Sequence, residues 1–338
     1  MDQAGSGNER DGQLMTIAFA QRRLKPERIA AAAGRIDPIF TASPQFVSDA
    51  LSSEIGCTAL LKVETVNPIR CFKGRGADWL IQEAVATGDD RPMICASAGN
   101  FGQAMAYAAT KAGRRITIYA AETANALKLD RMRALGGDVV VTGRDFDAAK
   151  AEAKRVAAEQ SLRMVEDSRD IETAEGAGTI GLELARGAEA FDAVIVPIGN
   201  GAMINGIATA IKDRMPDVRV IGVQARGAPA MKESWERGEP VETEQADTIC
   251  DGIAVRVPVP EAVADMAGLI DDVLLVDDAT TVRGMRLLHA HAGLVSEPSA
   301  GIAIGAALAH SELFRSQTVA FIVCGGNLTP DQMRQWLS

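Results

Sequence analysis

The sequence predicts an α/β protein built from two twisted, mostly parallel sheets flanked by helices. Short apolar segments rich in β-branched residues alternate with helical segments, which is typical of repeated strand–helix units. The length of 338 residues is too great for one small core. The expected strands cover residues 59–63, 93–96, 116–120, 138–142, 193–197, 218–224, 273–276 and 319–323. The expected helices cover residues 74–86, 102–112, 127–135, 147–160, 203–215 and 280–292.

These segments fall into two groups, which predict two domains. Residues 93–161 hold three strand–helix units in close succession and form the expected smaller domain. Residues 25–92 and 162–338 form the expected larger domain. Residues 1–24 begin with a polar, acidic stretch and are expected to form a flexible tail.

Composition narrows the class of protein. The net charge is −10, and Lys and Arg are scattered along the chain, so neither nucleic acid nor an anionic membrane is an expected partner. The N-terminus lacks the pattern of a signal peptide, and no apolar run has membrane-spanning length. The five Cys are widely spaced and only three His accompany them, which argues against a disulfide framework or a zinc site. A cytoplasmic location is therefore expected.

Ligands of open α/β sheets bind beyond the carboxyl ends of the strands, so the loops after the strands are the places to look for chemistry. The strand at 193–197 runs into small residues at 199–202, and a helix is expected to begin at Met203. Free N–H groups at such a helix start suit a phosphate. A tight turn without a ligand would have the same sequence. Ile204 stands where a dinucleotide fingerprint needs Gly.

A second loop, Ser97-Ala-Gly-Asn-Phe-Gly-Gln103, follows the strand at 93–96 and opens a helix. Its backbone N–H groups suit a carboxylate, and the Asn100 amide could bond a phenolic oxygen. Taken alone, the pattern is more typical of an Asn at a helix N-cap.

A third motif places Lys73 at a helix start, near Arg70 and Arg75. Such positive surroundings favour the neutral amine that attacks an aldehyde. Taken alone, Lys73 is better explained as a solvated surface lysine. A fourth motif places Cys324 and two glycines after the last strand. That thiol could meet a ring nitrogen, although a buried Cys before a turn is common.

Taken together, these motifs resemble the fold type II pyridoxal-phosphate enzymes, which share a tryptophan-synthase-β-like fold. The particular likeness is to the group of threonine/serine dehydratases and serine racemases. The matching segments are Asn67-Pro-Ile-Arg-Cys-Phe-Lys-Gly-Arg-Gly-Ala, Ser97-Ala-Gly-Asn-Phe-Gly-Gln, Pro197-Ile-Gly-Asn-Gly-Ala-Met, Asp251-Gly-Ile-Ala-Val, Glu297-Pro-Ser and Cys324-Gly-Gly-Asn. The resemblance extends over nearly the whole chain, from about residue 35 to residue 328.

The resemblance implies that the cofactor is pyridoxal 5′-phosphate and that Lys73 holds it and later takes the Cα proton. In the group it resembles, the cofactor phosphate gives a proton to the leaving hydroxyl. The other residues implied to bind the cofactor are Phe72, Asn100, Gly199, Asn200, Gly201, Ala202, Met203, Gly252 and Cys324. The residues implied to bind substrate are Ser97, Ala98, Gly99, Asn100 and Gln103.

The implied reaction is β-elimination from a 3-hydroxy amino acid such as L-threonine or L-serine, which gives an enamine that hydrolyses to a 2-oxo acid and ammonia. Alternatives are racemisation, β-replacement, a non-standard substrate (3-hydroxyaspartate, phenylserine or a hydroxyectoine-related compound), and a binding module without activity. Intact Lys73 and Asn100 argue against the binding module, since folding needs neither. The resemblance further implies a homodimer or homotetramer.

Two departures from the group bear on these alternatives. Serine racemase has Ser at the second position of the asparagine loop, where this chain has Ala98, so racemisation by two bases lacks its second base. Related enzymes bind a divalent metal through a Glu after the strand that follows the glycine loop. This chain has Gln224 there and Ala230 at the position of a second ligand, so no metal is expected at that site.

Overall fold

The structure is a computed structural model that describes residues 21–338. The strands are β1 (Gln45–Val47), β2 (Thr58–Val63), β3 (Met93–Ala96), β4 (Ile116–Ala120), β5 (Asp138–Val141), β6 (Arg163–Val165), β7 (Ala193–Pro197), β8 (Arg219–Ala225), β9 (Asp272–Val276) and β10 (Thr318–Val323). The helices are α2 (Pro26–Ala33), α3 (Asp49–Ile55), α4 (Lys73–Ala86), α5 (Asn100–Lys111), α6 (Ala126–Ala134), α7 (Phe146–Glu159), α8 (Ile171–Arg186), α9 (Ala202–Arg214), α10 (Ala230–Arg237), α11 (Pro260–Met266), α12 (Asp278–Ala292), α13 (Pro298–Ala309) and α14 (Pro330–Leu337), with a 3₁₀ turn η1 at Asp251–Ile253.

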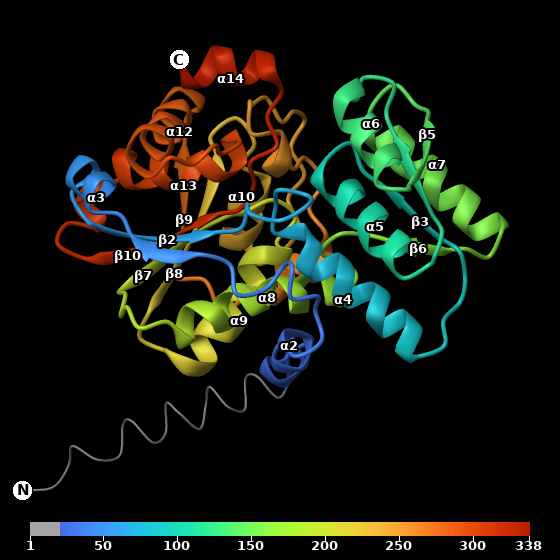
Figure 1. Ribbon diagram of the computed structural model, residues 1–338, viewed down its shortest axis with the longest axis horizontal. Coiled ribbons are helices and arrows are strands. Elements are labelled where there is room, and N and C mark those ends of the chain that lie inside the picture. Colours follow the sequence, from blue (N-terminus) through green and yellow to red (C-terminus); the bar gives the residue numbers. More distant parts are fainter. Residues whose placement is uncertain (1–20) are drawn as a thin grey trace, which may run out of the picture.

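The larger sheet has the strand order β1-β2-β10-β7-β8-β9. All of its neighbouring strands are parallel except β1, which runs antiparallel to β2. Helices α12 and α13 cover one face and α8 and α9 the other (Figure 1). These strands are buried on both faces, which explains why they appear in the sequence as unbroken apolar runs.

The smaller sheet has the strand order β5-β4-β3-β6, and all its pairs are parallel. Helix α7 packs on one face, and α5 and α6 lie on the other (Figure 1). Strand β6 pairs with β3 through Arg163, Met164 and Val165. These residues lie just past the domain boundary predicted after residue 161, so the smaller sheet extends beyond that boundary.

The predicted fold class is confirmed, and each of the eight predicted strands and six predicted helices corresponds to an element of the structure. The predicted tail needs correction at its end. Residues 1–20 lie outside the described part, but Arg23 pairs with Asp265 at 2.6 Å and Leu24 is buried against α2, α8 and α9. This apolar contact and the ion pair hold the chain here, so a flexible tail through residue 24 is wrong for these two residues.

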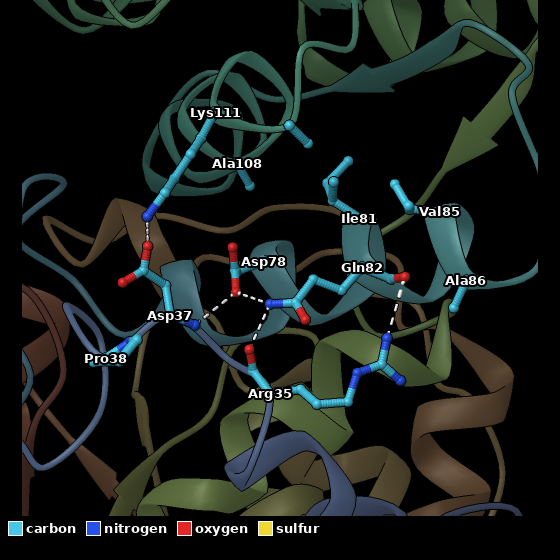
Figure 2. A pocket seen from close by; sticks show the side chains of 11 residues that line it. Arg35, Asp37, Pro38, Asp78, Ile81, Gln82, Val85, Ala86, Ala108 and Lys111 are labelled. Atoms are coloured by element: carbon cyan, nitrogen blue, oxygen red, sulfur yellow. Dashed lines mark hydrogen bonds and ion pairs between the residues drawn. The ribbon is translucent and has the colours of Figure 1, made fainter.

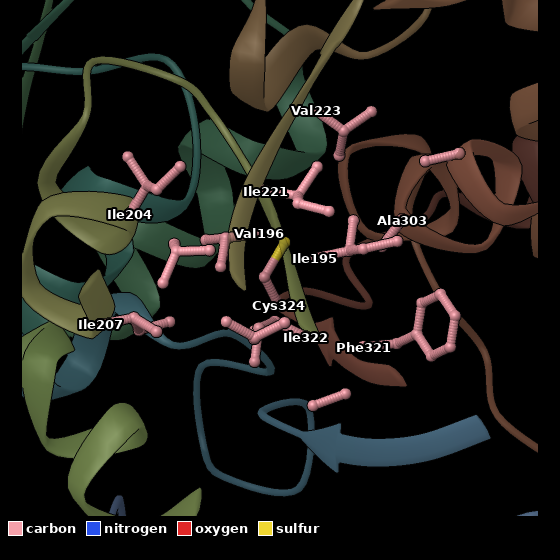
Figure 3. Packing of buried hydrophobic residues seen from close by; sticks show 14 of the residues in the cluster. Ile195, Val196, Ile204, Ile207, Ile221, Val223, Ala303, Phe321, Ile322 and Cys324 are labelled. Atoms are coloured by element: carbon pink, nitrogen blue, oxygen red, sulfur yellow. The ribbon is translucent and has the colours of Figure 1, made fainter. Parts of the chain in front are cut away.

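The main core lies within the larger domain, where β7, β8 and β10 meet α9 and α13. Figure 3 shows Ile195 and Phe321 on the side of the sheet that faces Ala303 of α13, whereas Val196 lies toward Ile204 of α9. Because the strands are packed on both faces, their carboxyl ends are held in fixed positions relative to the core. The loops that leave these ends therefore begin from rigid positions.

Close helix packing fixes the start of α4. A Cβ atom placed on Gly176 of α8 would lie 2.5 Å from the carbonyl oxygen of Arg75 and 2.5 Å from Gly76 Cα. A Cβ placed on Gly76 would come within 2.7 Å of the Thr173 carbonyl oxygen. Only glycine permits so close an approach at these two positions. The contact presses the first turn of α4, which begins at Lys73, against α8.

Candidate active site

A cavity of about 330 Å³ lies between the two sheets, beyond the carboxyl ends of their strands. Three helices begin at its wall: α4 at Lys73, α5 at Asn100 and α9 at Ala202. Helix N-termini present unpaired N–H groups and partial positive charge, so the cavity is suited to anionic groups. Its size falls in the range of small-molecule sites.

The glycine loop lines the cavity. Within residues 21–338, the backbone N–H groups of Gly199, Asn200 and Gly201 donate to no acceptor. Gly201 has φ of 101°, a left-handed conformation that suits glycine. The Ala202 N–H donates to Ser168 Oγ at 3.0 Å, so this predicted phosphate ligand already has a partner. The loop therefore offers three uncommitted donors to an anion.

Lys73 lies on the wall between the two loops. Its Nζ donates to Asp167 Oδ2 at 2.6 Å and lies 4.7 Å from the centre of the Phe72 ring. The predicted positive surroundings of Lys73 are wrong, because the charge in contact with it is a carboxylate. Arg75 is fully buried and turned to Glu64 and Glu183, since two residues along a helix place a side chain on the opposite side.

The Asn100 amide is held in a network that the sequence did not reveal. Asn100 Nδ2 donates to Glu297 Oε1 at 2.8 Å, and Asn100 Oδ1 accepts from Asn327 Nδ2 at 2.9 Å. Glu297 Oε2 accepts from the Asn327 backbone N–H at 3.0 Å. Burial raises the pKa of the Glu297 carboxyl, and the charge of Asp251 adds to the rise. The network fixes which way the Asn100 amide faces.

Cys324 follows the carboxyl end of β10 and lines the cavity. Its Sγ donates to the Ser299 carbonyl oxygen at 3.4 Å. Burial raises the pKa of this thiol well above its usual value, and the charge of Glu297 acts in the same direction, so the thiol is neutral. The Ser299 Oγ atom is buried without a hydrogen-bond partner among the described residues.

The asparagine loop forms the remaining wall. Ser97 Oγ accepts from the Gly99 N–H at 3.2 Å and from the Gly102 N–H at 2.9 Å, which folds the loop tightly over the start of α5. Ser97, Ala98 and Gly99 line the cavity. Gln103 does not: it lies one helical turn further on and its side chain is buried within the domain. The contact between Gln103 and substrate stays a prediction.

The structure thus gathers the predicted residues, apart from Gln103, around one cavity. They are Phe72, Lys73, Ser97, Ala98, Gly99, Asn100, Gly199, Asn200, Gly201, Ala202, Met203, Gly252 and Cys324. Sequence reasoning missed the lining residues Lys128, Asp167, Ser168, Glu297 and Ser299. Glu297 and Ser299 belong to the Glu297-Pro-Ser segment that matched the family, but the sequence assigned neither of them a function. Asp167 and Ser168 follow a three-residue strand that no pattern predicted.

A larger cavity of about 630 Å³ lies between α4 and α5 (Figure 2). Its polar groups are already paired with one another: Asp37 with Lys111, and Gln82 Nε2 with Asp78 Oδ2 at 2.6 Å. The Gln82 and Arg35 side chains also bond each other's carbonyl oxygens. It contains neither Lys73 nor a loop with uncommitted donors, so the smaller cavity is the candidate active site.

Comparison with known proteins agrees with this geometry. The family model described as "Pyridoxal-phosphate dependent enzyme" matches residues 36–325. The chain belongs to this family. It is 34% identical over 309 residues to a biosynthetic L-threonine dehydratase of Mycobacterium tuberculosis, an alignment that covers 88% of this chain and 71% of that protein. The predictions of family, fold type and cofactor are thereby confirmed.

Solved structures of the pyridoxal-phosphate-dependent enzyme family are similar over most of the chain. Maize serine racemase matches with a TM-score of 0.87 and 26% identity, covering 92% of this chain and 96% of its own. The processed form of threonine deaminase isoform 2 from Solanum lycopersicum matches with a TM-score of 0.84 and 29% identity, covering 91% of this chain and 92% of its own.

The residues of the cavity fit pyridoxal phosphate. Three unpaired backbone donors at the start of α9 suit its phosphate, and the Lys73 amine suits its aldehyde. The neutral Cys324 thiol and the unpartnered Ser299 hydroxyl suit the pyridine nitrogen. A Cβ placed on Gly252 would lie 2.7 Å from Ser299 Oγ, so glycine keeps this side of the cavity open.

The metal prediction concerned Gln224 and Ala230. Gln224 is buried in β8, where its Oε1 accepts from the Lys232 N–H at 2.8 Å. Among the residues that the structure describes, no three His, Cys, Asp or Glu side chains are grouped to hold a metal ion. The absence of a metal at this position stays a prediction. In the same part of the chain, no helix is both long and apolar enough to cross a bilayer.

Proposed function

We propose that the enzyme catalyses β-elimination from a 3-hydroxy amino acid such as L-threonine or L-serine, with release of a 2-oxo acid and ammonia. One observation carries the proposal: the Lys73 amine faces the same cavity as the uncommitted donors of the glycine loop and the N-terminal loop of α5. A cofactor anion, a reactive amine and a place for the substrate carboxylate thus lie around a single space.

The residues divide the work as follows. Pyridoxal phosphate supplies the electron sink for the pair released from Cα. Gly199, Asn200 and Gly201 would hold its phosphate through their N–H groups, and Lys73 would hold the cofactor and then serve as base for the Cα proton. The loop of Ser97, Ala98 and Gly99 receives the substrate carboxylate at the positive end of α5.

The neutral thiol of Cys324, if it lies beside the pyridine nitrogen, favours elimination over reactions that need a long-lived carbanion. A thiol with a raised pKa does not hold a full positive charge on a ring nitrogen as a carboxylate would. Beside this thiol a bound cofactor would withdraw electrons less strongly, so negative charge at Cα would be less well stabilised. Prompt loss of a β-substituent suits such a site better than transamination does.

Racemisation is the main alternative, because maize serine racemase is a structural relative. Ala98 offers no hydroxyl as a second base. Asp167 does not replace it, because its Oδ2 lies 2.6 Å from Lys73 Nζ and therefore on the lysine side. The related L-threonine dehydratase and the L-threonine ammonia-lyase of Thermotoga maritima, which is 32% identical over 281 residues, support elimination instead.

The test is 2-oxo acid formation by the purified holoenzyme from a panel of substrates. The panel holds L-threonine, L-serine, 3-hydroxyaspartate, phenylserine and a hydroxyectoine-related compound, with the D-enantiomers of the first two as controls. We expect oxo acid and ammonia in equal amounts from at least one L-substrate. Chiral chromatography of the remaining substrate detects racemisation, and an added thiol detects β-replacement. Enantiomer exchange without oxo acid from any member would overturn the proposal.

We also propose that the enzyme works in the cytoplasm as a homodimer or homotetramer and binds neither nucleic acid nor membrane. The scattered basic residues and the net charge of −10 support the last two points. Light scattering after size-exclusion chromatography measures the oligomeric state directly, and a monomer at micromolar concentration would contradict it.

A further inference from the structure

The carboxylate of Asp167 is placed against the reactive amine of the site. Its Oδ2 lies 2.6 Å from Lys73 Nζ, and both side chains are mostly buried, with 15% and 17% exposed. Both line the cavity that also holds the glycine loop. Among residues 21–338, Lys73 is the one hydrogen-bond or ion-pair partner of the Asp167 carboxylate.

The other charged groups of the cavity are committed elsewhere. Lys128 of α6 pairs with Asp251, across the gap between the two sheets. Glu297 accepts hydrogen bonds from Asn100 and from the Asn327 backbone. Asp167 is therefore the carboxylate that serves the amine, and no second cation in the described cavity competes for it.

The short loop after β6 fixes the Asp167 carboxylate in place. The next residue, Ser168, is buried and has a φ of 69°, which is unusual for a residue other than glycine. Its Oγ accepts from the Ala202 N–H at 3.0 Å, and its own N–H donates to Thr173 Oγ1 at 3.0 Å. Backbone strain of this kind persists where surrounding contacts enforce it, often at functional sites. The loop thus ties the carboxylate to the cofactor-binding helix α9.

We propose that Asp167 is a positioning residue that directs Lys73 through both proton transfers of the elimination. The inference rests on the proposed function. Lys73 Nζ takes the Cα proton, and the electron pair of that bond forms the Cα=Cβ bond as the Cβ–O bond breaks. The proton on Lys73 then passes to the departing oxygen, which leaves as water. The Asp167 carboxylate compensates the ammonium charge and holds it toward the β-carbon.

This role differs from the one implied by the group that the chain resembles, where the cofactor phosphate protonates the leaving group. A lysine that both takes and returns the proton needs no second acid. It does need to stay in one place while charged, and a carboxylate at hydrogen-bond distance does this better than a neutral amide, because it adds charge to geometry.

The experiment compares three variants with wild-type holoenzyme. Asp167→Asn keeps the shape and the hydrogen bond but removes the charge, and Asp167→Glu restores the charge on a longer side chain. Asp170→Asn is the matched control, because Asp170 lies in the same loop but does not line the cavity. For each protein, kcat and KM are measured with ordinary and Cα-deuterated substrate. The rate at which the apoenzyme captures pyridoxal phosphate is followed by absorbance.

We expect Asp167→Asn to lower kcat about 100-fold, the effect of a misplaced catalytic group, with KM changed less than about threefold. The deuterium isotope effect on kcat should rise, because Cα–H cleavage becomes slower relative to other steps. Asp167→Glu should recover part of kcat, and Asp170→Asn should stay within about twofold of wild type. Asp167→Asn should also capture pyridoxal phosphate several-fold faster, because the amine is released from its ion pair.

The outcomes separate this inference from the proposed function. If wild type releases oxo acid and Asp167→Asn matches its kcat and isotope effect, the positioning role is wrong while β-elimination stands. A loss of kcat that comes with loss of cofactor capture, and that Asp167→Glu does not restore, would also overturn it, since Asp167 would then serve the structure alone. If wild type releases no oxo acid, the proposed function itself fails.

Discussion

Two cations in the first turn of α4, only two residues apart, have opposite surroundings. Lys73 faces the cavity and has one carboxylate partner, Asp167. Arg75 faces the core with no exposed surface and binds Glu64, Glu183 and Thr179. Because successive helical residues are turned by about 100°, these two side chains point to opposite sides of the helix. A single helical turn thus carries a reactive ion pair and a structural one.

On the buried side of α4, each nitrogen of the Arg75 guanidinium has a hydrogen-bond partner. Arg75 Nε lies 2.8 Å from Glu64 Oε2, and its Nη1 lies 2.6 Å from Glu183 Oε1. Lys62 of β2 also reaches Glu183, at 2.5 Å. Two cations and two carboxylates therefore balance in a network that joins β2, α4 and α8. We infer that this network holds the first turn of α4 firmly enough for Lys73 to keep its place with a single partner.

The largest effect is expected from removal of Lys73, the cation of α4 that faces the cavity. Lys73→Ala should lower lyase activity by at least about a thousandfold, because both the cofactor link and the base are lost. The visible absorbance of bound cofactor should disappear. The free energy of urea unfolding of the apoenzyme should change by about 1 kcal/mol or less, because Asp167 lines the cavity, where water can hydrate its carboxylate once Lys73 is removed. Retained absorbance would show that another amine holds the cofactor.

The second prediction concerns Arg75, the cation of α4 that faces the core. Arg75→Met should lower the free energy of unfolding by about 3–5 kcal/mol, because Glu64 and Glu183 lose a buried counter-charge. Urea denaturation followed by circular dichroism measures the loss. Arg155→Met is the matched control: Arg155 also binds two carboxylates, Glu152 and Glu159, but its side chain is 54% exposed and both partners are exposed as well. The control should change the free energy of unfolding far less than Arg75→Met does. Equal losses would contradict the structural role of burial.

The same contrast separates what the sequence predicted from what it did not. The strands of the larger sheet were predictable because burial on both faces leaves unbroken apolar runs, as in Ala193–Pro197. Helix α13 was missed because its residues are mostly small and apolar and are buried on nearly every side of the helix, so the sequence shows no amphipathic period. Helix α8 was missed because Gly176, Gly178 and Gly181 resemble turn signals, whereas at least Gly176 permits close helix packing.

In the site, local motifs located the glycine loop, the asparagine loop and Lys73, because each lies at a helix start with its own sequence pattern. Partners brought from distant segments were not predictable. Asp167 lies 94 residues from Lys73, and Glu297 lies 197 residues from Asn100. The mistaken expectation about Arg75 had the same origin, since nearness in sequence was taken for nearness in space. Only the fold decides which carboxylate meets which cation.

The third prediction concerns the pH dependence of stability that the Glu183 carboxyl contributes on the core side. Burial alone would raise the pKa of Glu183, but the hydrogen bond and charge of Arg75, with the charge of Lys62, lower it to about 2 from 4.5. A lowered pKa in the folded state gives stability that is present above pH 4.5 and lost as pH falls toward 2. The loss should be about 3 kcal/mol. Glu183→Gln should flatten the decline of unfolding free energy over this range, and an unchanged slope would contradict the coupling.

The smallest expected effect concerns polar groups without partners. Thr179 Oγ1 on the core side accepts from Arg75 at 2.9 Å, whereas Ser299 Oγ on the cavity side has no partner among the described residues. Removing an unsatisfied buried hydroxyl should stabilise the apoenzyme, so Ser299→Ala should raise its unfolding free energy by about 1 kcal/mol. If the hydroxyl serves the cofactor ring, the same change should raise the Kd for pyridoxal phosphate several-fold.

Ser296 provides the matched control for this last prediction. Its Oγ is also buried without a partner in residues 21–338, but Ser296 does not line the cavity. Ser296→Ala should therefore raise stability by a similar amount, about 1 kcal/mol, and leave the Kd unchanged. Thermal unfolding of apoenzyme and fluorescence titration with pyridoxal phosphate measure the two quantities. If both variants bind the cofactor equally well, Ser299 does not contact the ring, and its lack of a partner is a packing defect like that of Ser296.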